Sequence, residues 1–355
     1  MEKQSSIMLF RQKNRWGLTV FSVVLSFMLA PYVSVGLFMP QVLPILMLAM
    51  LGFVGPASVV ACGGVLVGVC GFFYGLIGGL CAILLIVPVL VASTVLVERR
   101  AGFFVSAGIC AGVMFASVGV ILALISVMAG TNVATALSNM IRVAFESMGE
   151  EADQLLAILA QFGMSSLPSG VELGQLAEGV ALSAQERAEM INTFVYVANV
   201  YFSVQLPVQM TVGSLAAGVL GQAVLRRGAI ARGIAVPYPP LRTWRLPSGW
   251  GRVLGGTLAV LYVAALLTSS MAVMASVFNG VFTELFALQG IAAIAYKLHE
   301  SGKGKRWRVL LFILGYFVIR PAATIVGIAD QAFDFTRRRA QLDTEDNPYD
   351  PRARL

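Results

Sequence analysis

The chain has 355 residues, of which 58% are hydrophobic and only 12% are charged. Because ordinary soluble domains carry roughly 25% charged residues, this composition excludes a water-soluble globular protein. The formal net charge is +7, but the Lys and Arg residues cluster in short segments between apolar runs, as in the loops of membrane proteins. A lipid bilayer is therefore the expected partner, and no nucleic acid is expected.

Residues 17–97 form a stretch of 81 residues without Asp, Glu, Lys, Arg or His. About 20 predominantly apolar residues span a bilayer as a helix, so this stretch contains several consecutive crossings. The apolar runs are continuous and do not alternate with a period of two residues, which favours helices over a β-barrel. The sequence therefore predicts an all-α, polytopic transmembrane helical bundle.

Apolar segments are predicted at residues 18–39, 42–56, 57–76, 78–97, 102–129, 194–225, 252–278, 281–298 and 309–330. The positive-inside rule places four basic regions in the cytoplasm, namely the amino terminus, Arg99 with Arg100, residues 226–252 and residues 297–308. Full crossing by every segment would leave the arginines at 337–339 outside. We therefore expect about eight crossings (range seven to nine), one re-entrant segment and a cytoplasmic carboxyl-terminal tail, with an external tail as the alternative.

The expected organisation has four parts: transmembrane helices at 1–130, an acidic extracytoplasmic helical segment at 131–190, transmembrane helices at 191–339, and a disordered tail at 340–355. The acidic segment holds eight acidic and two basic residues, which favours the outer side. Its apolar content is thin for a core, so a helical hairpin is expected, with helices at 132–162 and 173–190 and a turn at 167–170. Ser183 and Glu186 have the spacing of a capping box.

Small residues recur at four-residue spacing inside the apolar runs, in the sets Gly64/Gly68, Gly71/Gly75/Gly79, Gly108/Gly112 and Gly213/Ala217/Gly221. Such spacing lets membrane helices approach closely. Packing within the bundle is the simpler interpretation, and docking of a partner protein is the alternative.

The sequence offers little for catalysis. The single histidine, His299, lies in a short basic loop, and the four cysteines lie in apolar segments without the spacing of a metal site. No G-x-S-x-G or H-E-x-x-H motif is present. We therefore expect no enzyme activity, no metal and no cofactor.

Polar residues inside apolar segments are stronger candidates, because charge near the bilayer centre usually faces an interior or a cavity. Glu284 and Arg320 form a candidate intramembrane pair, with Gln289 and Asp330 nearby in the sequence. The alternative for Glu284 is a position at the outer interface of the membrane.

The segment at 194–225 contains Asn199, Gln205 and Gln209, which partly share a face, and Pro207, which interrupts the helical hydrogen bonding. Interrupted helices form the midplane sites of many transporters, so these amides are candidate ligand contacts. A kinked helix whose amides bond to neighbouring helices is the alternative.

The loop at 226–252 contains six arginines and no acidic residue. Its residues Arg242, Trp244, Arg245 and Trp250 suit contact with lipid headgroups or with a cytoplasmic partner protein.

Three short motifs in the carboxyl-terminal third identify a resemblance: Pro240-x-x-x-Trp244-x-Leu246-Pro247, Leu288-Gln289-Gly290 and Gly327-x-x-Asp330. They resemble the YybS family of predicted bacterial membrane proteins, and the amino-terminal helices agree in hydropathy. The resemblance implies a bacterial cytoplasmic (inner) membrane protein, and the positive-inside rule gives it a cytoplasmic amino terminus. It also implies a fold similar to the S components of energy-coupling-factor transporters, which capture small molecules.

Two features depart from that resemblance. The acidic segment 131–190 is longer than such a fold requires, and the first apolar segment lacks an A-x-x-x-A pair for a coupling partner. Two functions follow as hypotheses. The first is binding or transport of a small solute in an intramembrane cavity, and the second is a non-transporting scaffold that docks membrane or cytoplasmic proteins in the cell envelope.

Overall fold

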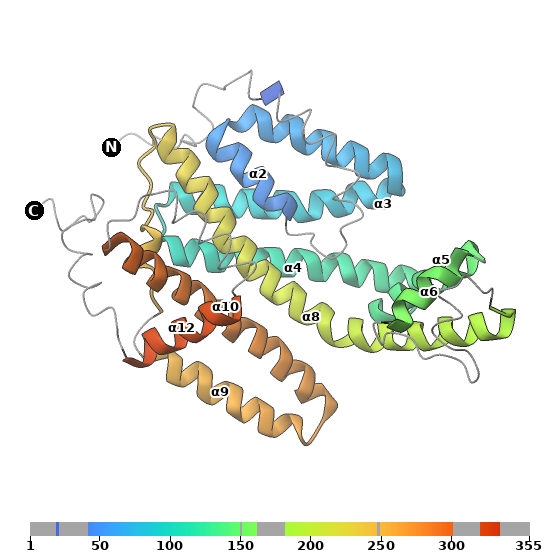
Figure 1. Ribbon diagram of the computed structural model, residues 1–355. Helices are drawn as coiled ribbons and strands as arrows, with labels where there is room; N and C mark the ends of the chain where they lie inside the picture. Colours follow the sequence, from blue (N-terminus) through green and yellow to red (C-terminus); the bar gives the residue numbers. More distant parts are fainter. Residues whose placement is uncertain are drawn as a thin grey trace, which may run out of the picture. The chain divides into compact units, whose positions relative to one another are not determined.

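The computed structural model describes residues 19–20, 42–149, 151–161, 182–246, 249–300 and 320–333. Within these ranges every secondary-structure element is a helix, which confirms the all-α class (Figure 1). Four of the described helices are long and apolar enough to cross a membrane: Gly75–Glu98, Phe103–Ala129, Ala184–Ala231 and Ser270–His299. The predicted first segment, apart from residues 19–20, and the first half of the ninth, residues 309–319, lie outside the described residues.

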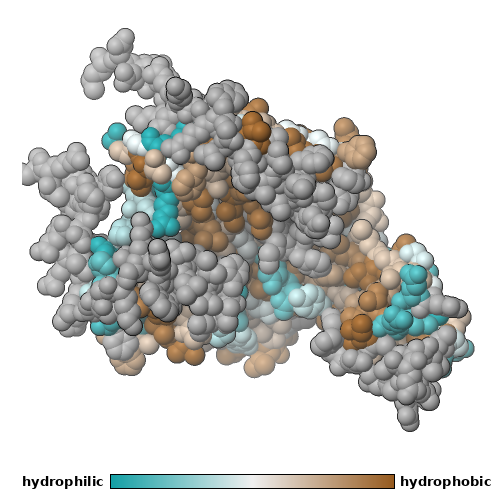
Figure 2. All heavy atoms as spheres, turned by 45° about the horizontal axis from the view of Figure 1, so that its top comes forward, coloured by the Kyte–Doolittle hydropathy of each residue, from teal (hydrophilic) through white to brown (hydrophobic). Residues whose placement is uncertain are grey.

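The chain divides into two compact units. Residues 1–118 and 209–355 form what we call the large unit, and residues 119–208 form the small unit. On the face drawn in Figure 2, the described residues form hydrophobic areas with hydrophilic residues gathered in patches. Large apolar side chains such as Phe72, Leu76 and Leu266 are exposed on it, as is expected of helices that face lipid.

The first helices of the large unit are α2 (Val42–Phe53) and α3 (Pro56–Glu98), followed by α4 (Phe103–Ala129). Helix α3 doubles back on itself at Gly75 (Figure 1), where φ is 69° and ψ is −170°. This left-handed φ suits glycine, and it places a break close to the one predicted between 57–76 and 78–97. A Cβ atom at Gly79 would lie 3.4 Å from the carbonyl oxygen of Val67, so the small residues let the two arms of α3 approach closely.

Helix α8 (Ala184–Ala231) packs through glycines in its large-unit part. A Cβ atom at Gly228 would lie 2.4 Å from the carbonyl carbon of Gly52 on α2, and one at Gly218 would lie 2.5 Å from the carbonyl oxygen of Ala107 on α4. These distances support packing within the bundle. At Gly108 and Gly112, in contrast, a Cβ atom would meet no described atom within 4 Å.

The carboxyl-terminal helices are α9 (Trp250–Ala265), α10 (Ser269–Glu300) and α12 (Arg320–Phe333), preceded by the short 3-10 helix η1 (Leu241–Thr243). The expected boundary between 252–278 and 281–298 is wrong, because residues 279–280 lie inside α10 and the chain turns at 266–268. The physical reason is the cap at Thr268, whose Oγ1 accepts a hydrogen bond from the backbone N–H of Met271 at 3.4 Å.

Helices α10 and α12 cross with their backbones in contact. A Cβ atom at Gly290 would lie 1.8 Å from the carbonyl oxygen of Ala323, and one at Gly327 would lie 1.9 Å from the carbonyl oxygen of Phe286. No side chain larger than hydrogen fits at either position unless the helices move apart.

The small unit contains α5 (Val133–Met148), α6 (Glu151–Gln161), the end of α4 and the start of α8. One helix was expected at 132–162, but Gly149, with φ at 59°, separates α5 from α6. The expected turn at 167–170 lies outside the described residues. The unit has a small apolar core, which the composition did not indicate, formed by Ala152, Leu156, Ala160, Leu182, Met190, Ile191 and Val195.

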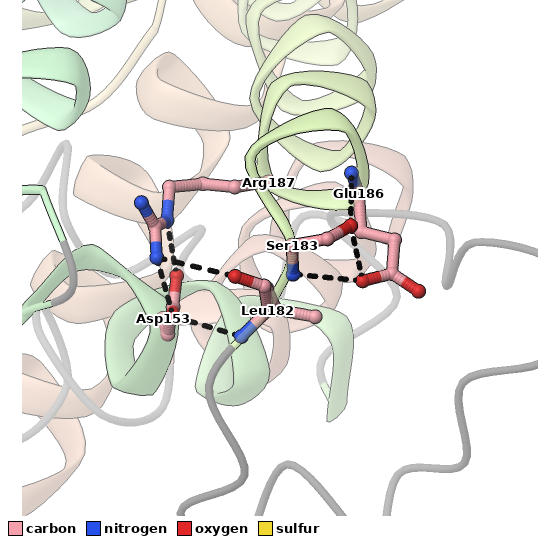
Figure 3. Close-up of polar contacts among 5 residues, drawn as sticks. All are labelled: Asp153, Leu182, Ser183, Glu186 and Arg187. Carbon is pink, nitrogen blue, oxygen red and sulfur yellow. Dashed lines mark hydrogen bonds and ion pairs between the residues drawn. The ribbon is translucent and has the colours of Figure 1, made fainter.

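An ion pair joins α6 to the start of α8 (Figure 3). Arg187 donates through Nε to Asp153 Oδ1 at 2.6 Å and through Nη2 to Oδ2 at 2.8 Å, and the backbone N–H of Leu182 donates to Oδ2 at 3.1 Å. The predicted capping box is confirmed, because Ser183 N–H donates to Glu186 Oε2 at 2.8 Å and Glu186 N–H donates to Ser183 Oγ at 3.3 Å.

The crossing of α10 and α12 predicts that Gly327→Ala destabilises the protein. An added methyl group must push the helices apart, and overpacking of this kind costs roughly 1–3 kcal/mol or more. Thermal unfolding in detergent should show a clear fall in melting temperature, whereas the control Gly112→Ala, at an open position inside α4, should leave it unchanged or raise it slightly, because alanine favours the helix. Equal melting temperatures for the two variants would contradict the backbone contact.

Removal of the carboxylate in Asp153→Asn should loosen the small unit. The loss of one partner from a largely buried ion pair costs roughly 3–5 kcal/mol. Hydrogen exchange should therefore become faster in α6 and in the first turns of α8. The control Glu151→Gln, an exposed position on the same helix, should exchange like the wild type; unchanged protection in Asp153→Asn would show that the pair contributes nothing.

Candidate functional site

The crossing of α10 and α12 brings polar side chains together inside an apolar bundle. The glycine contact holds the two helix axes close enough for side chains that flank it to bond across the crossing. We call the following residues the crossing cluster: Glu284 and Gln289 on α10, and Arg320, Asp330 and Gln331 on α12.

The predicted pairing of Glu284 with Arg320 is confirmed. Arg320 Nη2 donates to Glu284 Oε2 at 2.8 Å, and the Glu284 side chain is fully buried while that of Arg320 is 37% exposed. This bond is the one that the Arg320 guanidinium makes among the described residues. Its Nε–H is buried without a hydrogen-bond partner. Most of the donor capacity of Arg320 is thus unused.

The second bond of the crossing cluster joins two motifs that are far apart in the sequence. Gln289 Nε2 donates to Asp330 Oδ2 at 3.0 Å and to Gln331 Oε1 at 3.0 Å. Gln289 Oε1 is buried and has no described partner. The motifs Leu288-Gln289-Gly290 and Gly327-x-x-Asp330 therefore meet through their glycines and through a glutamine–aspartate bond. Gln331 was not predicted from the sequence. Asp330 was named because it ends the motif Gly327-x-x-Asp330, and Gln331 lies just outside that motif.

A second polar cluster, around Arg226 on α8, was also missed. Arg226 is fully buried. Its Nη2 donates to the carbonyl oxygen of Ala101 at 2.9 Å and to Ser106 Oγ at 2.7 Å, its Nη1 donates to the carbonyl oxygen of Pro237, and its Nε donates to Gln222 Oε1 at 3.3 Å. Arg226 was not predicted to be buried because it lies at the end of an apolar segment, where the sequence indicates an exposed basic loop.

Gln222 extends the Arg226 cluster into the bundle. Its Nε2 donates to Ser93 Oγ at 3.0 Å and to Cys110 Sγ at 3.2 Å. None of the described carboxylates pairs with Arg226, so carbonyl and hydroxyl oxygens solvate the cation. Each of the three guanidinium nitrogens therefore makes at least one bond, as a buried charge requires.

Basic regions meet at one end of the large unit. Arg226 bonds to the turn at 99–102, Arg232 Nη1 donates to the carbonyl oxygen of Leu51 at 2.9 Å, and Arg242 contacts His299. The turn after α2, the turn before α4, the loop at 232–246 and the end of α10 are therefore neighbours. This agrees with the predicted topology, which assigns three of these four, the turn before α4, the loop and the end of α10, to the cytoplasmic side of the membrane.

The four loop residues that were expected to contact lipid or a partner protein differ in their exposure to solvent. Trp244 is 4% exposed, its Nε1–H donates to the carbonyl oxygen of Pro239 at 3.1 Å, and its ring lies 4.8 Å from that of Phe103. The ring therefore anchors the loop inside the large unit. Trp250 is 48% exposed, and Arg242 and Arg245 are partly exposed. Burial raises the pKa of the neighbouring Tyr238 above its usual value.

The three candidate amides of the segment at 194–225 are divided between the two units. Asn199 and Gln205 belong to the small unit, where Asn199 Nδ2 donates to Thr135 Oγ1 at 3.1 Å. Gln209 is exposed at the start of the next part of the large unit. Helix α8 continues through Pro207 from Ala184 to Ala231. Because proline has no N–H, one helical hydrogen bond is missing there; membrane helices tolerate this when neighbouring groups satisfy the freed carbonyl.

No group of three or more His, Cys, Asp or Glu side chains in the described ranges is placed to hold a metal ion.

The family comparison agrees with the membrane character of the chain. The family described as "Predicted membrane protein (DUF2232)" matches residues 17–331, and the chain belongs to this family. The match includes both helices of the crossing cluster. No curated protein and no solved structure matches the chain. The finer resemblance to the YybS family and to S components stays a prediction.

The Arg226 cluster predicts a specific effect of Arg226→Met. The apolar side chain cannot bond to the carbonyl oxygens of Ala101 and Pro237, so the loop at 232–246 loses its tie to the bundle. Trypsin cleavage in this loop should become about tenfold faster, as expected for loss of more than one hydrogen bond to a charged group. The control is Arg227→Met, the exposed neighbouring arginine; the same cleavage rate in both variants would contradict the tie.

Proposed function

We propose that this membrane protein binds a small anionic solute at the crossing cluster of α10 and α12. The observation that carries the proposal is the unused donor capacity of Arg320. Its guanidinium donates one hydrogen bond to Glu284, and its Nε–H is buried without a partner. A carboxylate or a phosphate would accept from this free side of the guanidinium in the two-bond geometry that arginine favours.

Energetics support a ligand at this position. A buried donor without a partner costs roughly 1–3 kcal/mol, and more for a charged group. Charged residues in membrane segments usually face a polar interior. An anion at Arg320 would remove the cost of the free Nε–H, and Glu284 would limit binding to anions that compete for the same guanidinium.

Gln289 supplies the complementary group. Its buried Oε1 is an acceptor without a described partner, so the crossing cluster offers a donor on α12 and an acceptor on α10. On α12 the backbone contact at Ala323 and Gly327 lies between Arg320 and Asp330, so this acceptor is a second polar position in the cluster, and one small solute is not expected to reach both groups.

A scaffold without transport is the second candidate, and the tight crossing favours it. Glu284, Gln289 and Asp330 already bond to partners across the crossing, and the glycine backbones touch. Those contacts suit a purely structural cluster. For either function we propose no catalysis, because the sequence has one histidine and no motif that pairs a nucleophile with a base.

Mass spectrometry of compounds that copurify with the full chain tests the proposal. Wild type, Arg320→Ala and Gln205→Ala are purified in detergent, and aqueous and lipid extracts are measured separately. A compound with a carboxylate or a phosphate should be retained by wild type and by Gln205→Ala, and should fall about tenfold or more in Arg320→Ala, as for loss of a charged hydrogen bond. Gln205→Ala is the control because Gln205 lies in the small unit.

The two extracts distinguish the source of the anion. Loss from the aqueous extract identifies a soluble solute, and loss from the lipid extract identifies a lipid headgroup. Arg320→Lys, which retains the charge but not the planar guanidinium, replaces Arg320→Ala if the alanine variant does not fold. A folded variant that retains the same anions as wild type overturns the proposal, and wild type without any bound anion favours the scaffold.

A further inference from the structure

The small unit contains a cavity that is separate from the crossing cluster. Its volume is about 210 Å³, and its lining comes from α5, the turn after it and the first three turns of α8. Polar groups lie at its wall, namely Arg142, Glu146, Arg187 and Asn192, with Ile191 as an apolar contribution. All of these residues belong to the small unit.

Arg142 is the cation with free donors at this cavity. It donates through Nη1 to Asn192 Oδ1 on α8, and no other described group bonds to it. This bond fixes the side chain across the gap between α5 and α8. Arg187, in contrast, is held by both oxygens of Asp153, so its charge is already balanced.

Glu146 provides the opposite charge. It lies one helical turn after Arg142 on α5, and both residues line the cavity. Residues at this spacing share a helix face and often form an ion pair, but no such bond is present here because Arg142 is turned to Asn192. A cation and a carboxylate therefore line the same cavity without a bond between them among the described contacts.

The size of the cavity restricts the ligand. Sites for drug-sized molecules usually measure about 300–1,000 Å³, so about 210 Å³ suits a smaller molecule. We propose that this cavity binds a free α-amino acid, whose carboxylate accepts from Arg142 and whose ammonium group donates to Glu146. The side chain of the amino acid then lies against Ile191 and Gly149. This inference concerns the small unit and does not depend on the function proposed for α10 and α12.

Thermal shift measurements on the full chain in detergent test this assignment. The probes are the individual L-amino acids, each titrated up to roughly 10 mM, a range that detects millimolar dissociation constants. At least one amino acid should raise the melting temperature of wild type. Its N-acetyl derivative and its amide should each lose this effect, because each derivative removes one of the two charges.

Variants connect the effect to the cavity. Arg142→Gln and Glu146→Gln should each weaken binding about tenfold or more, as expected for loss of a hydrogen bond between charged groups. The matched controls are Arg252→Gln and Glu189→Gln, because both residues are exposed and neither lines the cavity. These two variants should bind like wild type.

Three results would overturn the assignment. The first is the absence of a shift with any amino acid in wild type. The second is wild-type binding by both cavity variants, when their melting temperatures without ligand show that they are folded. The third is loss of binding in Arg320→Ala but not in Arg142→Gln, which would assign the ligand to the crossing cluster instead.

Discussion

In a bilayer the hydrophobic effect gives two apolar helices little free energy of association, because lipid is as apolar as their side chains. Their association therefore depends on close packing and on polar bonds. Contact between the backbones of α10 and α12 at Gly290 and Gly327 meets this constraint most tightly in the described part of the chain. The glycines bring the axes together, and the Gln289–Asp330 and Glu284–Arg320 bonds then reach across the crossing. Larger side chains at the glycines would separate the partners of both bonds.

The side chains of Arg226 and Arg320, both in the large unit, differ in how their guanidinium groups are hydrogen-bonded. Arg226 is surrounded by carbonyl and hydroxyl oxygens and uses donors on all three of its nitrogens. Arg320 has a carboxylate partner but leaves its Nε–H buried and unbonded. Bonding at every nitrogen fits a structural role, since it offsets the cost of burial. Incomplete bonding beside a fully buried Glu284 fits a site that can accept another group.

Hydropathy was sufficient to predict the class of the fold, because only helices and closed β-barrels can satisfy the backbone hydrogen bonds of an apolar segment in lipid. The capping box at Ser183 and the pair of Glu284 with Arg320 were also predictable, the first from local spacing and the second from the cost of isolated charge. The turn at 266–268 was not, because Leu266 and Leu267 continue an apolar run and only the cap at Thr268 marks the break. Burial of Trp244 was equally hidden, since its neighbours in sequence are basic while its contacts are distant.

The bonds of Arg226 also bear on how the protein is made. Membrane proteins are synthesised from the amino terminus, so earlier segments are in place before later ones. Ala101 and Ser106 precede Arg226 by 125 and 120 residues. When α8 enters the bilayer, most of the oxygens that will surround its cation have therefore already been inserted. Of its bonded partners, only the carbonyl oxygen of Pro237 is synthesised afterwards. The basic loop therefore supplies the last hydrogen-bond acceptor of Arg226.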